Sequence, residues 1–135
     1  MTLKKTDREE VVKFRLEKAR NTLAEVPVLI ENKFYRTAAN RLYYVCFYAV
    51  TALLINDAFE THTHSGVKTL FGLHYIKGNI IEKSFGKMYQ KLFNLRQDGD
   101  YEDWFEIDKE DIIPNLAPVE KFIEAIENLI NNKNM

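Results

Sequence analysis

The sequence has very little cysteine, glycine and proline. Its 135 residues include one Cys, five Gly and three Pro. A lone cysteine, Cys46, excludes an internal disulfide framework and any zinc site that needs several cysteines. So few Gly and Pro argue against an all-β fold, which needs many turns. No apolar run reaches the roughly 18–20 residues of a membrane span, and the first residues lack the apolar core of a signal peptide. We therefore expect a cytoplasmic protein without a membrane segment.

The net charge is also close to zero, but basic and acidic residues are concentrated in different parts of the chain. Lys and Arg total 19 and Asp and Glu total 20, so the formal net charge is −1. Residues 1–97 carry an excess of seven basic side chains, and residues 98–135 carry an excess of eight acidic ones. A site for a phosphate or a polyanion is compatible with this sequence if the acidic stretch at 97–111 faces away from the ligand or gates the site.

Apolar residues recur with helical spacing along the whole chain, at steps of three and four residues. This spacing predicts helices at about 6–27, 31–56, 65–77 and 81–96, and a last one that begins between 108 and 118. We predict a single all-α domain over residues 1–135. Its architecture is an antiparallel up-and-down bundle of four main helices plus a short or fifth C-terminal helix. The alternative is a less regular orthogonal array of helices.

Several residues predict where these helices begin and end. Thr6 and Glu9 have the spacing of a capping box at the first helix, and Pro27 ends that helix or marks its last turn. Gly78 is expected to stop the third helix, and Asp98-Gly99-Asp100 is expected to break the fourth. Asp108 can cap the last helix, and two downstream prolines predict an irregular or kinked start to it, Pro114 and Pro118.

The predicted helix at 31–56 is apolar on two opposite faces. One face is the core stripe around Cys46. The opposite face carries two tyrosines, an isoleucine and one arginine: Arg41, Tyr44, Tyr48 and Ile55. A helix that is apolar nearly all round is buried all round, and one bundle covers only one face. We therefore predict a homodimer through this second helix. The alternative is that a fifth helix or residues 98–111 cover the second face within one chain.

Arg41 is the informative residue of this second face. A guanidinium on an apolar and aromatic surface needs a partner, because an unpaired charge there costs several kcal/mol. One partner is a carboxylate such as Asp100 or Glu102. The other is a phosphate, which a guanidinium grips with two hydrogen bonds. The chemistry of the residue alone favours neither.

Three segments resemble a known family. TAANRLYYVCFYAVTALL at 37–54 resembles the signature helix of HEPN domains (higher eukaryote and prokaryote nucleotide-binding), in the small bacterial and archaeal branch with an R-x-Y-Y-x-x-F pattern. That branch has a following T-H-x-G-V element, which matches Thr63 to Val67 here. It also has R-x-x-x-D-Y after the fourth helix, which matches Arg96, Asp100 and Tyr101.

The resemblance implies an up-and-down bundle that dimerises through the signature helix. Many members of the family are ribonuclease toxins, or subunits paired with a minimal nucleotidyltransferase encoded beside them, as in toxin–antitoxin modules. The catalytic pattern of the family is an Arg followed, after four to six residues, by a His. Two copies of this pattern meet across the dimer cleft and cleave RNA without a metal ion.

This chain departs from that pattern. Arg41 is present, but the three positions where the His would stand hold Cys46, Phe47 and Tyr48. A tyrosine, with a reference pKa near ~10, exchanges protons poorly at neutral pH, so the sequence leaves open whether the chain is an enzyme. A second family pattern is R-x-x-x-x-H-x-Y, whose Tyr is a target of adenylylation. Arg41 and Tyr48 match it, and Cys46 replaces the His.

We therefore expect a homodimeric HEPN-domain protein that partners a nucleotidyltransferase or binds a nucleotide or RNA in the dimer cleft. The cleft-lining residues are Asn40, Arg41, Tyr44 and Tyr48. The candidate catalytic residues are Arg41 and Tyr48, and the supporting family elements are His64, Arg96, Asp100 and Tyr101. One alternative is an active metal-independent ribonuclease toxin that uses Arg41. Another is a dimerisation scaffold without catalysis.

No cofactor and no metal site are predicted. His62, His64 and His74 could in principle bind zinc, but their spacing matches no zinc motif. Cys46 lies on the inward stripe, where a free cysteine acts as a small apolar residue.

Overall fold

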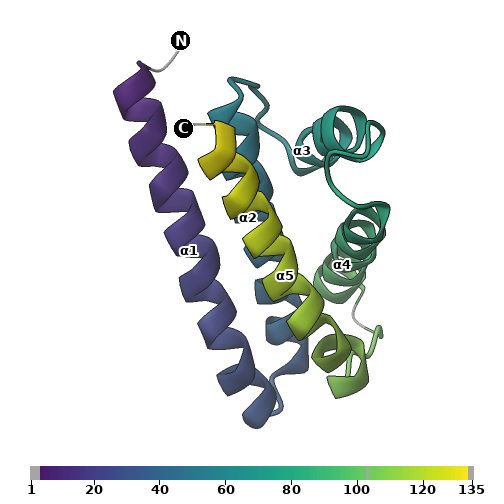
Figure 1. Ribbon diagram of the computed structural model, residues 1–135. Helices are drawn as coiled ribbons and strands as arrows, with labels where there is room; N and C mark the ends of the chain where they lie inside the picture. The colour runs from purple at the N-terminus through teal and green to yellow at the C-terminus, as the bar shows by residue number, and fades with distance from the viewer. Residues whose placement is uncertain (1–3, 103, 134–135) are drawn as a thin grey trace.

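The computed structural model describes residues 4–102 and 104–133, and it is helical (Figure 1). A π-helical segment, η1 (Gly72–Ile76), continues the third of its α-helices. The α-helices are α1 (Lys5–Glu31), α2 (Tyr35–Asn56), α3 (His64–Phe71), α4 (Lys83–Tyr101) and α5 (Lys109–Lys133). The described residues contain no strand, so the prediction of an all-α fold is confirmed.

The four long helices run alternately in opposite directions. In Figure 1, α1 runs downward, α2 upward, α4 downward and α5 upward, and the short α3 lies at the top between α2 and α4. This is the antiparallel bundle that the sequence predicts. The short helix is the third one, however, and the C-terminal α5 is a full helix of 25 residues.

The central element of the bundle is α2, which packs against α1, α3, α4 and α5. Of its 22 residues, 13 are buried, including the whole stripe around Cys46. By length and composition alone this helix would be able to cross a membrane, which was not expected. The explanation is its place in the core, because 72% of its most apolar 18-residue window is buried inside the molecule.

The first helix covers part of the second face of α2. Tyr48 is 9% exposed, and the Lys18 ammonium of α1 lies 4.8 Å from the centre of its ring. The element that covers this part of the face is therefore α1, and not a fifth helix or residues 98–111. The half-buried residues that remain on the upstream part of α2 are Tyr35, Asn40, Arg41, Tyr44 and Phe47.

Two of the predicted start signals are wrong. The N-cap of α1 is Lys4, without a side-chain cap, and Thr6 lies inside the helix, so Thr6 and Glu9 form no capping box. The second helix begins at Tyr35, later than expected. Pro27 lies inside α1, near its end at Glu31, in agreement with the last-turn alternative.

The third helix stops before Gly78, as expected, since η1 ends at Ile76 with Lys77 as its C-cap, but the break expected at Asp98-Gly99-Asp100 is wrong. The residue with a left-handed backbone after η1 is Asn79, with φ of 59°. The fourth helix continues through Gly99 to Tyr101. A Cβ at position 99 would lie 2.6 Å from Ile107 Cδ1, so this glycine serves close packing and not chain reversal.

The last helix runs without a break through both of its prolines. It begins at Lys109 and contains Pro114 and Pro118. Asp108 caps it as predicted, because its Oδ1 accepts a hydrogen bond from the Glu110 N–H at 3.1 Å. The irregular start expected between 108 and 118 is therefore an ordinary capped helix.

Candidate functional site

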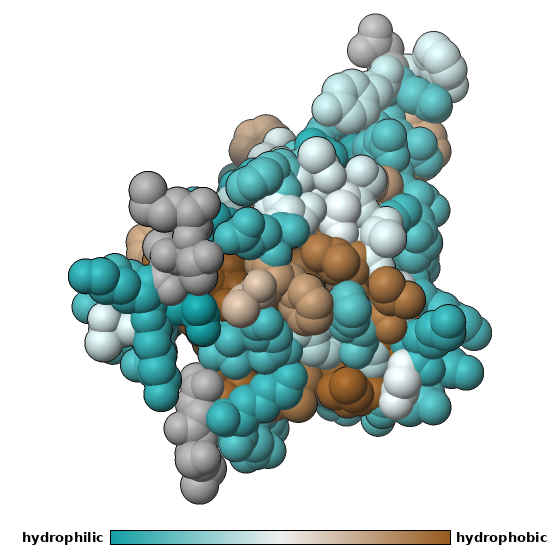
Figure 2. Space-filling view, turned by 90° about the horizontal axis from the view of Figure 1, so that it is seen from above, coloured by the Kyte–Doolittle hydropathy of each residue, from teal (hydrophilic) through white to brown (hydrophobic). Residues whose placement is uncertain are grey.

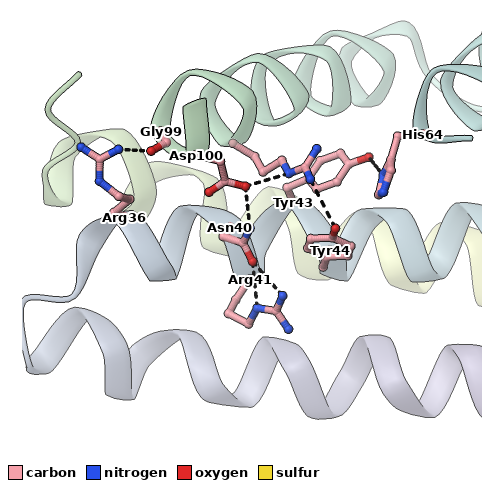
Figure 3. Close-up of polar contacts among 9 residues, drawn as sticks. Arg36, Asn40, Arg41, Tyr43, Tyr44, His64, Gly99 and Asp100 are labelled. Atoms are coloured by element: carbon pink, nitrogen blue, oxygen red, sulfur yellow. Dashed lines mark hydrogen bonds and ion pairs between the residues drawn. The ribbon is translucent and has the colours of Figure 1, made fainter. Parts of the chain in front are cut away.

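A polar cluster lies on the half-buried side of α2, where that helix faces α3 and α4 (Figure 3). The cluster joins all three segments that carry the family resemblance, although they are far apart along the chain. From α2 it contains Asn40, Arg41, Tyr43 and Tyr44, from α3 it contains His64, and from α4 it contains Arg96 and Asp100.

His64 is placed in this cluster by the local structure of the loop before it. Thr63 is the N-cap of α3, and its Oγ1 accepts a hydrogen bond from the Gly66 N–H at 2.9 Å. A Cβ at position 66 would lie 2.2 Å from Thr61 Oγ1 and 2.7 Å from Thr63 Oγ1, so only glycine fits there. The T-H-x-G spacing therefore fixes His64 as the first residue of α3.

The imidazole of His64 packs directly against α2. Its Nδ1 lies 2.8 Å from the Tyr43 hydroxyl. Its ring stacks on Phe47 with centroids 4.4 Å apart and meets the Tyr44 ring edge-on at 5.6 Å. Three residues of the signature helix, Tyr43, Tyr44 and Phe47, thus hold the histidine in one orientation.

The surroundings of this pair keep both groups uncharged at neutral pH. Burial, together with the positive charge of Arg96, lowers the pKa of His64 below its ordinary value of 6.5. Burial raises the pKa of Tyr43 to about 12. The site therefore contains a neutral imidazole in contact with a protonated phenol.

Arg96 brings α4 to the same place. Its Nε lies 3.1 Å from Asp100 Oδ2, one helical turn further on. Its Nη2 lies 3.5 Å from the Tyr44 hydroxyl, and its Cζ lies 5.6 Å from the centre of the Tyr44 ring. Asp100 Oδ2 also accepts a hydrogen bond from Asn40 Nδ2 at 3.0 Å. One carboxylate is thus shared by an arginine and an amide.

Arg41 lies on the other side of Asn40. Its Nε and Nη2 donate to Asn40 Oδ1 at 3.1 and 2.7 Å, and its Cζ lies 4.9 Å from the centre of the Tyr44 ring. Among the described residues it forms no ion pair with a carboxylate, so of the two partners considered for it, the carboxylate of Asp100 or Glu102 is not the one found. The Cζ atoms of two arginines therefore lie within 5.6 Å of the centre of the Tyr44 ring, and Asp100 contacts Arg96 while Asn40 contacts Arg41.

The acidic stretch after α4 borders the cluster instead of facing away from it. Asp100 is part of the cluster, and Arg36 of α2 donates hydrogen bonds to the carbonyls of Gly99 and Phe105. Tyr101 is 71% exposed, with its ring centre 5.9 Å from Arg96 Cζ. An exposed aromatic ring therefore stands next to the arginine.

Tyr48 and Cys46 occupy less open positions. Tyr48 lies under α1, with its ring centre 5.7 Å from that of Tyr44. Cys46 is fully buried, and burial raises the pKa of its thiol far above the usual range, so at neutral pH it is an inert thiol. In the part of the chain that the structure describes, no three His, Cys, Asp or Glu side chains could together hold a metal ion.

Next to the cluster, beyond Phe47, a hollow of about 280 Å³ lies between α1, the end of α2 and the start of α3. It is lined mostly by apolar side chains, including Phe47, Leu54, Ile55 and Phe59, with Arg15 at its edge. Figure 2 looks onto this end of the bundle and shows apolar side chains gathered in the middle of the face, with hydrophilic ones around them. The bundle thus presents apolar surface as well as charge at this end.

Sequence reasoning treated His64 only as a supporting element. The candidate catalytic pair, Arg41 and Tyr48, came from matching the family patterns, whose residues lie on the signature helix alone. The T-H-x-G segment was the available signal, but spacing alone does not show that its histidine meets α2.

Comparison with known proteins identifies the family of this chain. The family model of the HEPN domain matches residues 12–129. The chain is 32% identical over 126 residues to the "UPF0332 protein" of Thermotoga maritima, which covers 93% of this chain and 96% of that protein. It is 37% identical over 99 residues to a "Putative toxin" of Methanocaldococcus jannaschii, covering 73% of each chain. A second "Putative toxin" of that organism is 32% identical over 120 residues, with 89% of this chain and 82% of that one covered. The chain therefore belongs to the HEPN domain family, and its relatives include proteins named as toxins.

Proposed function

We propose that this protein is the toxin-like subunit of a toxin–antitoxin module and binds the phosphate of RNA or of a nucleotide in the cluster around Tyr44. The observation that carries the proposal is the pair of guanidinium groups, from Arg41 and Arg96, on one tyrosine. Arg41 has no carboxylate partner among the described residues, so it is available to an anion.

The chemistry of the surrounding residues fits such a ligand. A guanidinium binds phosphate with two parallel hydrogen bonds and is weakly hydrated, so it loses little by leaving water. The exposed ring of Tyr101 offers a surface on which a base can stack. Asn40 already donates its amide to one carboxylate and would donate in the same way to a phosphate oxygen.

The binding proposal is tested with a single-stranded 2′-O-methyl oligoribonucleotide, which binds but cannot be cleaved through its 2′-oxygen. Fluorescence anisotropy gives the Kd. Arg41→Ala removes charge-assisted hydrogen bonds worth about 1.5–3 kcal/mol, so Kd should rise by about tenfold or more. Lys121→Ala removes one exposed cation from α5 and should change Kd by less than about twofold. Equal weakening by both variants would indicate nonspecific attraction and would contradict the proposal.

We further propose that the partner is a minimal nucleotidyltransferase, as the resemblance to the family implies. In this proposal Tyr48 is the acceptor of a nucleotidyl group. Because Tyr48 is 9% exposed, modification requires α1 to move away from it. Co-expression with the nucleotidyltransferase encoded nearest to this gene should add the mass of a nucleotidyl group, and Tyr48→Phe should abolish the addition. An unmodified wild-type mass would contradict this role of Tyr48.

The two remaining functions make different predictions. A non-catalytic dimerisation scaffold binds neither RNA nor nucleotide, so a measurable Kd that depends on Arg41 would exclude it. An active ribonuclease binds RNA and also cleaves it, and expression of the wild-type protein should then inhibit growth while Arg41→Ala relieves the inhibition.

A further inference from the structure

A hollow of about 630 Å³ lies between α4 and the α3–η1 segment, on the side of the bundle away from α1 (Figure 1). Its lining is apolar between its charged residues, and comes from Phe71, Gly72, Ile76, Gly86 and Tyr89. One wall belongs to η1, and π-helical segments of this kind are rare and occur mostly at functional sites. The hollow is therefore a candidate for a second site, apart from the cluster around Tyr44.

Gly72, in the wall of the hollow, is a glycine that the fold itself does not explain. Its backbone is in the ordinary right-handed helical region, with φ of −61° and ψ of −45°, so other residues fit the backbone. A Cβ at this position would meet no atom within 4 Å, so close packing does not require glycine either. Glycine weakens a helix relative to alanine. Its presence leaves the hollow open, which has a purpose if a binding partner occupies that space.

The charged side chains that line the hollow are all lysines. One is Lys68 of α3, and the others are Lys83, Lys87 and Lys91 of α4, which we call the lysine row. The row follows steps of four residues, so it lies on one face of α4 and is about 12 Å long. Among the described residues, the lysine row forms no ion pair with a carboxylate. Three uncompensated positive charges thus border an apolar surface.

This surface is separate from the cluster around Tyr44. Arg96, which belongs to that cluster, follows Lys87 by nine positions along α4. At about 100° per residue, this spacing places the two side chains on opposite sides of the helix. An occupant of the hollow therefore contacts a different face of α4 from a ligand of the cluster.

We propose that the hollow docks an acidic amphipathic helix of a partner protein. Such a helix presents apolar side chains at i, i+3 or i+4, and i+7, which enter an apolar groove. Its carboxylates, one turn apart, match the one-turn spacing of the lysine row. The inference goes beyond the proposed function and does not depend on the binding of RNA.

The lining of the hollow favours a protein over RNA. Bases of single-stranded RNA stack on exposed aromatic rings. The two rings that line the hollow belong to Phe71 and Tyr89, and each of these residues is only 1% exposed. A helix with apolar side chains needs no exposed ring, because it is held by burial of aliphatic surface and by attraction between opposite charges.

The test uses a fluorescein-labelled synthetic helix of about 18 residues, or five turns, with leucines on one face and glutamates beside them. A second peptide has the same composition in an order that gives no apolar face. Fluorescence anisotropy with the purified full-length protein gives the Kd of each. The amphipathic peptide should bind at least about tenfold more tightly than the reordered one, because only its leucines enter the hollow together.

Charge reversal locates the bound peptide. Lys87→Glu changes the middle of the lysine row and should raise the Kd of the acidic peptide by about tenfold or more. Lys121→Glu makes the same change at an exposed position of α5 outside the hollow, so it should change Kd by less than about threefold. The combined variant Lys83→Glu, Lys87→Glu, Lys91→Glu should instead bind a peptide in which lysines replace the glutamates.

Gly72→Leu tests the hollow without changing any charge. The leucine side chain would occupy part of the hollow, so Kd should rise by about tenfold or more. The urea midpoint should be no lower than that of the wild type, since both the backbone and the free space admit a side chain. Gly78→Leu is the matched control, because a Cβ there also meets nothing within 4 Å but Gly78 does not line the hollow.

Several results would overturn the inference. Equal affinity for the two peptides, or an unchanged Kd in Gly72→Leu, would show charge attraction without docking in the hollow. RNA binding that Lys87→Glu weakens as strongly as peptide binding would assign the lysine row to nucleic acid. Self-association that Lys87→Glu abolishes, without binding of the acidic peptide, would assign the hollow to a second copy of this chain. The proposed phosphate site is tested separately, through Arg41→Ala.

Discussion

At the scale of single residues, Asp100 determines how much positive charge the site offers. Its carboxylate lies 3.1 Å from Arg96 Nε and accepts a hydrogen bond from Asn40 Nδ2 at 3.0 Å. It therefore orders both groups, it occupies the amide donor of Asn40, and its charge competes with that of a phosphate for Arg96. The side chains of Arg96 and Asp100 are 14% and 29% exposed, so solvent screens their attraction less than that of a surface pair.

We expect Asp100→Asn to strengthen the binding of RNA. The substitution removes one negative charge beside the proposed phosphate and leaves an amide oxygen to accept from Asn40. Kd should fall by about 3–10-fold, or about 1 kcal/mol, in the anisotropy assay. Asp98→Asn is the matched control, because it removes the same charge in the same turn of α4 without a contact to Arg96 or Asn40. A Kd that falls equally with both variants would show that only net charge matters.

At the scale of the elements, the end of α2 directs the chain toward His64. Ala58 has a φ of 63°, and the chain closes there with hydrogen bonds from Phe59 N to Leu54 O at 2.9 Å and from Ala58 N to Ile55 O at 3.0 Å. This is a Schellman motif, in which glycine is the usual residue at the left-handed position. Here an alanine occupies it, at a cost of about 1–2 kcal/mol.

Ala58→Gly should therefore stabilise the protein. Glycine adopts the left-handed conformation without steric strain, and Ala58 is exposed and packs little, so the free energy of unfolding should rise by about 1 kcal/mol. Urea denaturation measures it. The matched control is Ala24→Gly, on the exposed side of α1, which should lower the same free energy by about 1 kcal/mol because glycine weakens a helix interior. A loss of stability at both positions would contradict the strain at Ala58.

At the scale of the whole molecule, the bundle leaves an aromatic surface open beside α2. Tyr44 and Phe47 are half-buried, and Phe14 of α1 is 59% exposed. The Lys18 ammonium lies near one aromatic ring of each helix, 4.8 Å from the centre of the Tyr48 ring of α2 and 5.9 Å from that of the Phe14 ring of α1. Tyr, Phe and Arg are the residue types enriched at the cores of interfaces. This surface supports the prediction of a homodimer through the second helix, in which the cluster of one chain would lie near that of the other.

We expect a particle of about 32 kDa, twice the chain mass of 15.9 kDa, by sedimentation or light scattering at micromolar concentration. Phe14→Asp places a charge on the proposed interface and should weaken the dimer by about tenfold or more, because an unpaired buried charge is costly. Phe34→Asp is a matched control, since Phe34 is 60% exposed but lies between α1 and α2 at the other end of α2. A wild-type monomer, or equal effects of both substitutions, would contradict this interface.

Local sequence patterns were sufficient for much of the fold. The periodicity predicts the helical segments and the burial of Cys46, because apolar residues three and four positions apart lie on one helix face. Prediction from local patterns failed where a signal for a helix end competed with packing. Gly99 reads as a helix breaker, yet the helix continues because Ile107 packs against that glycine. Thr6 reads as a cap, yet the helix begins before it.

The sequence by itself thus determined an all-α chain of the HEPN family with Arg41 on the signature helix. Only the tertiary structure decided the composition of the cluster. It paired Asp100 with Arg96 instead of Arg41, covered Tyr48 with α1, and brought His64 to Tyr43 across the α2–α3 loop. The physical reason is distance along the chain. Helical spacing reports which residues share a face within a few turns, whereas contacts between helices depend on how the bundle closes around α2.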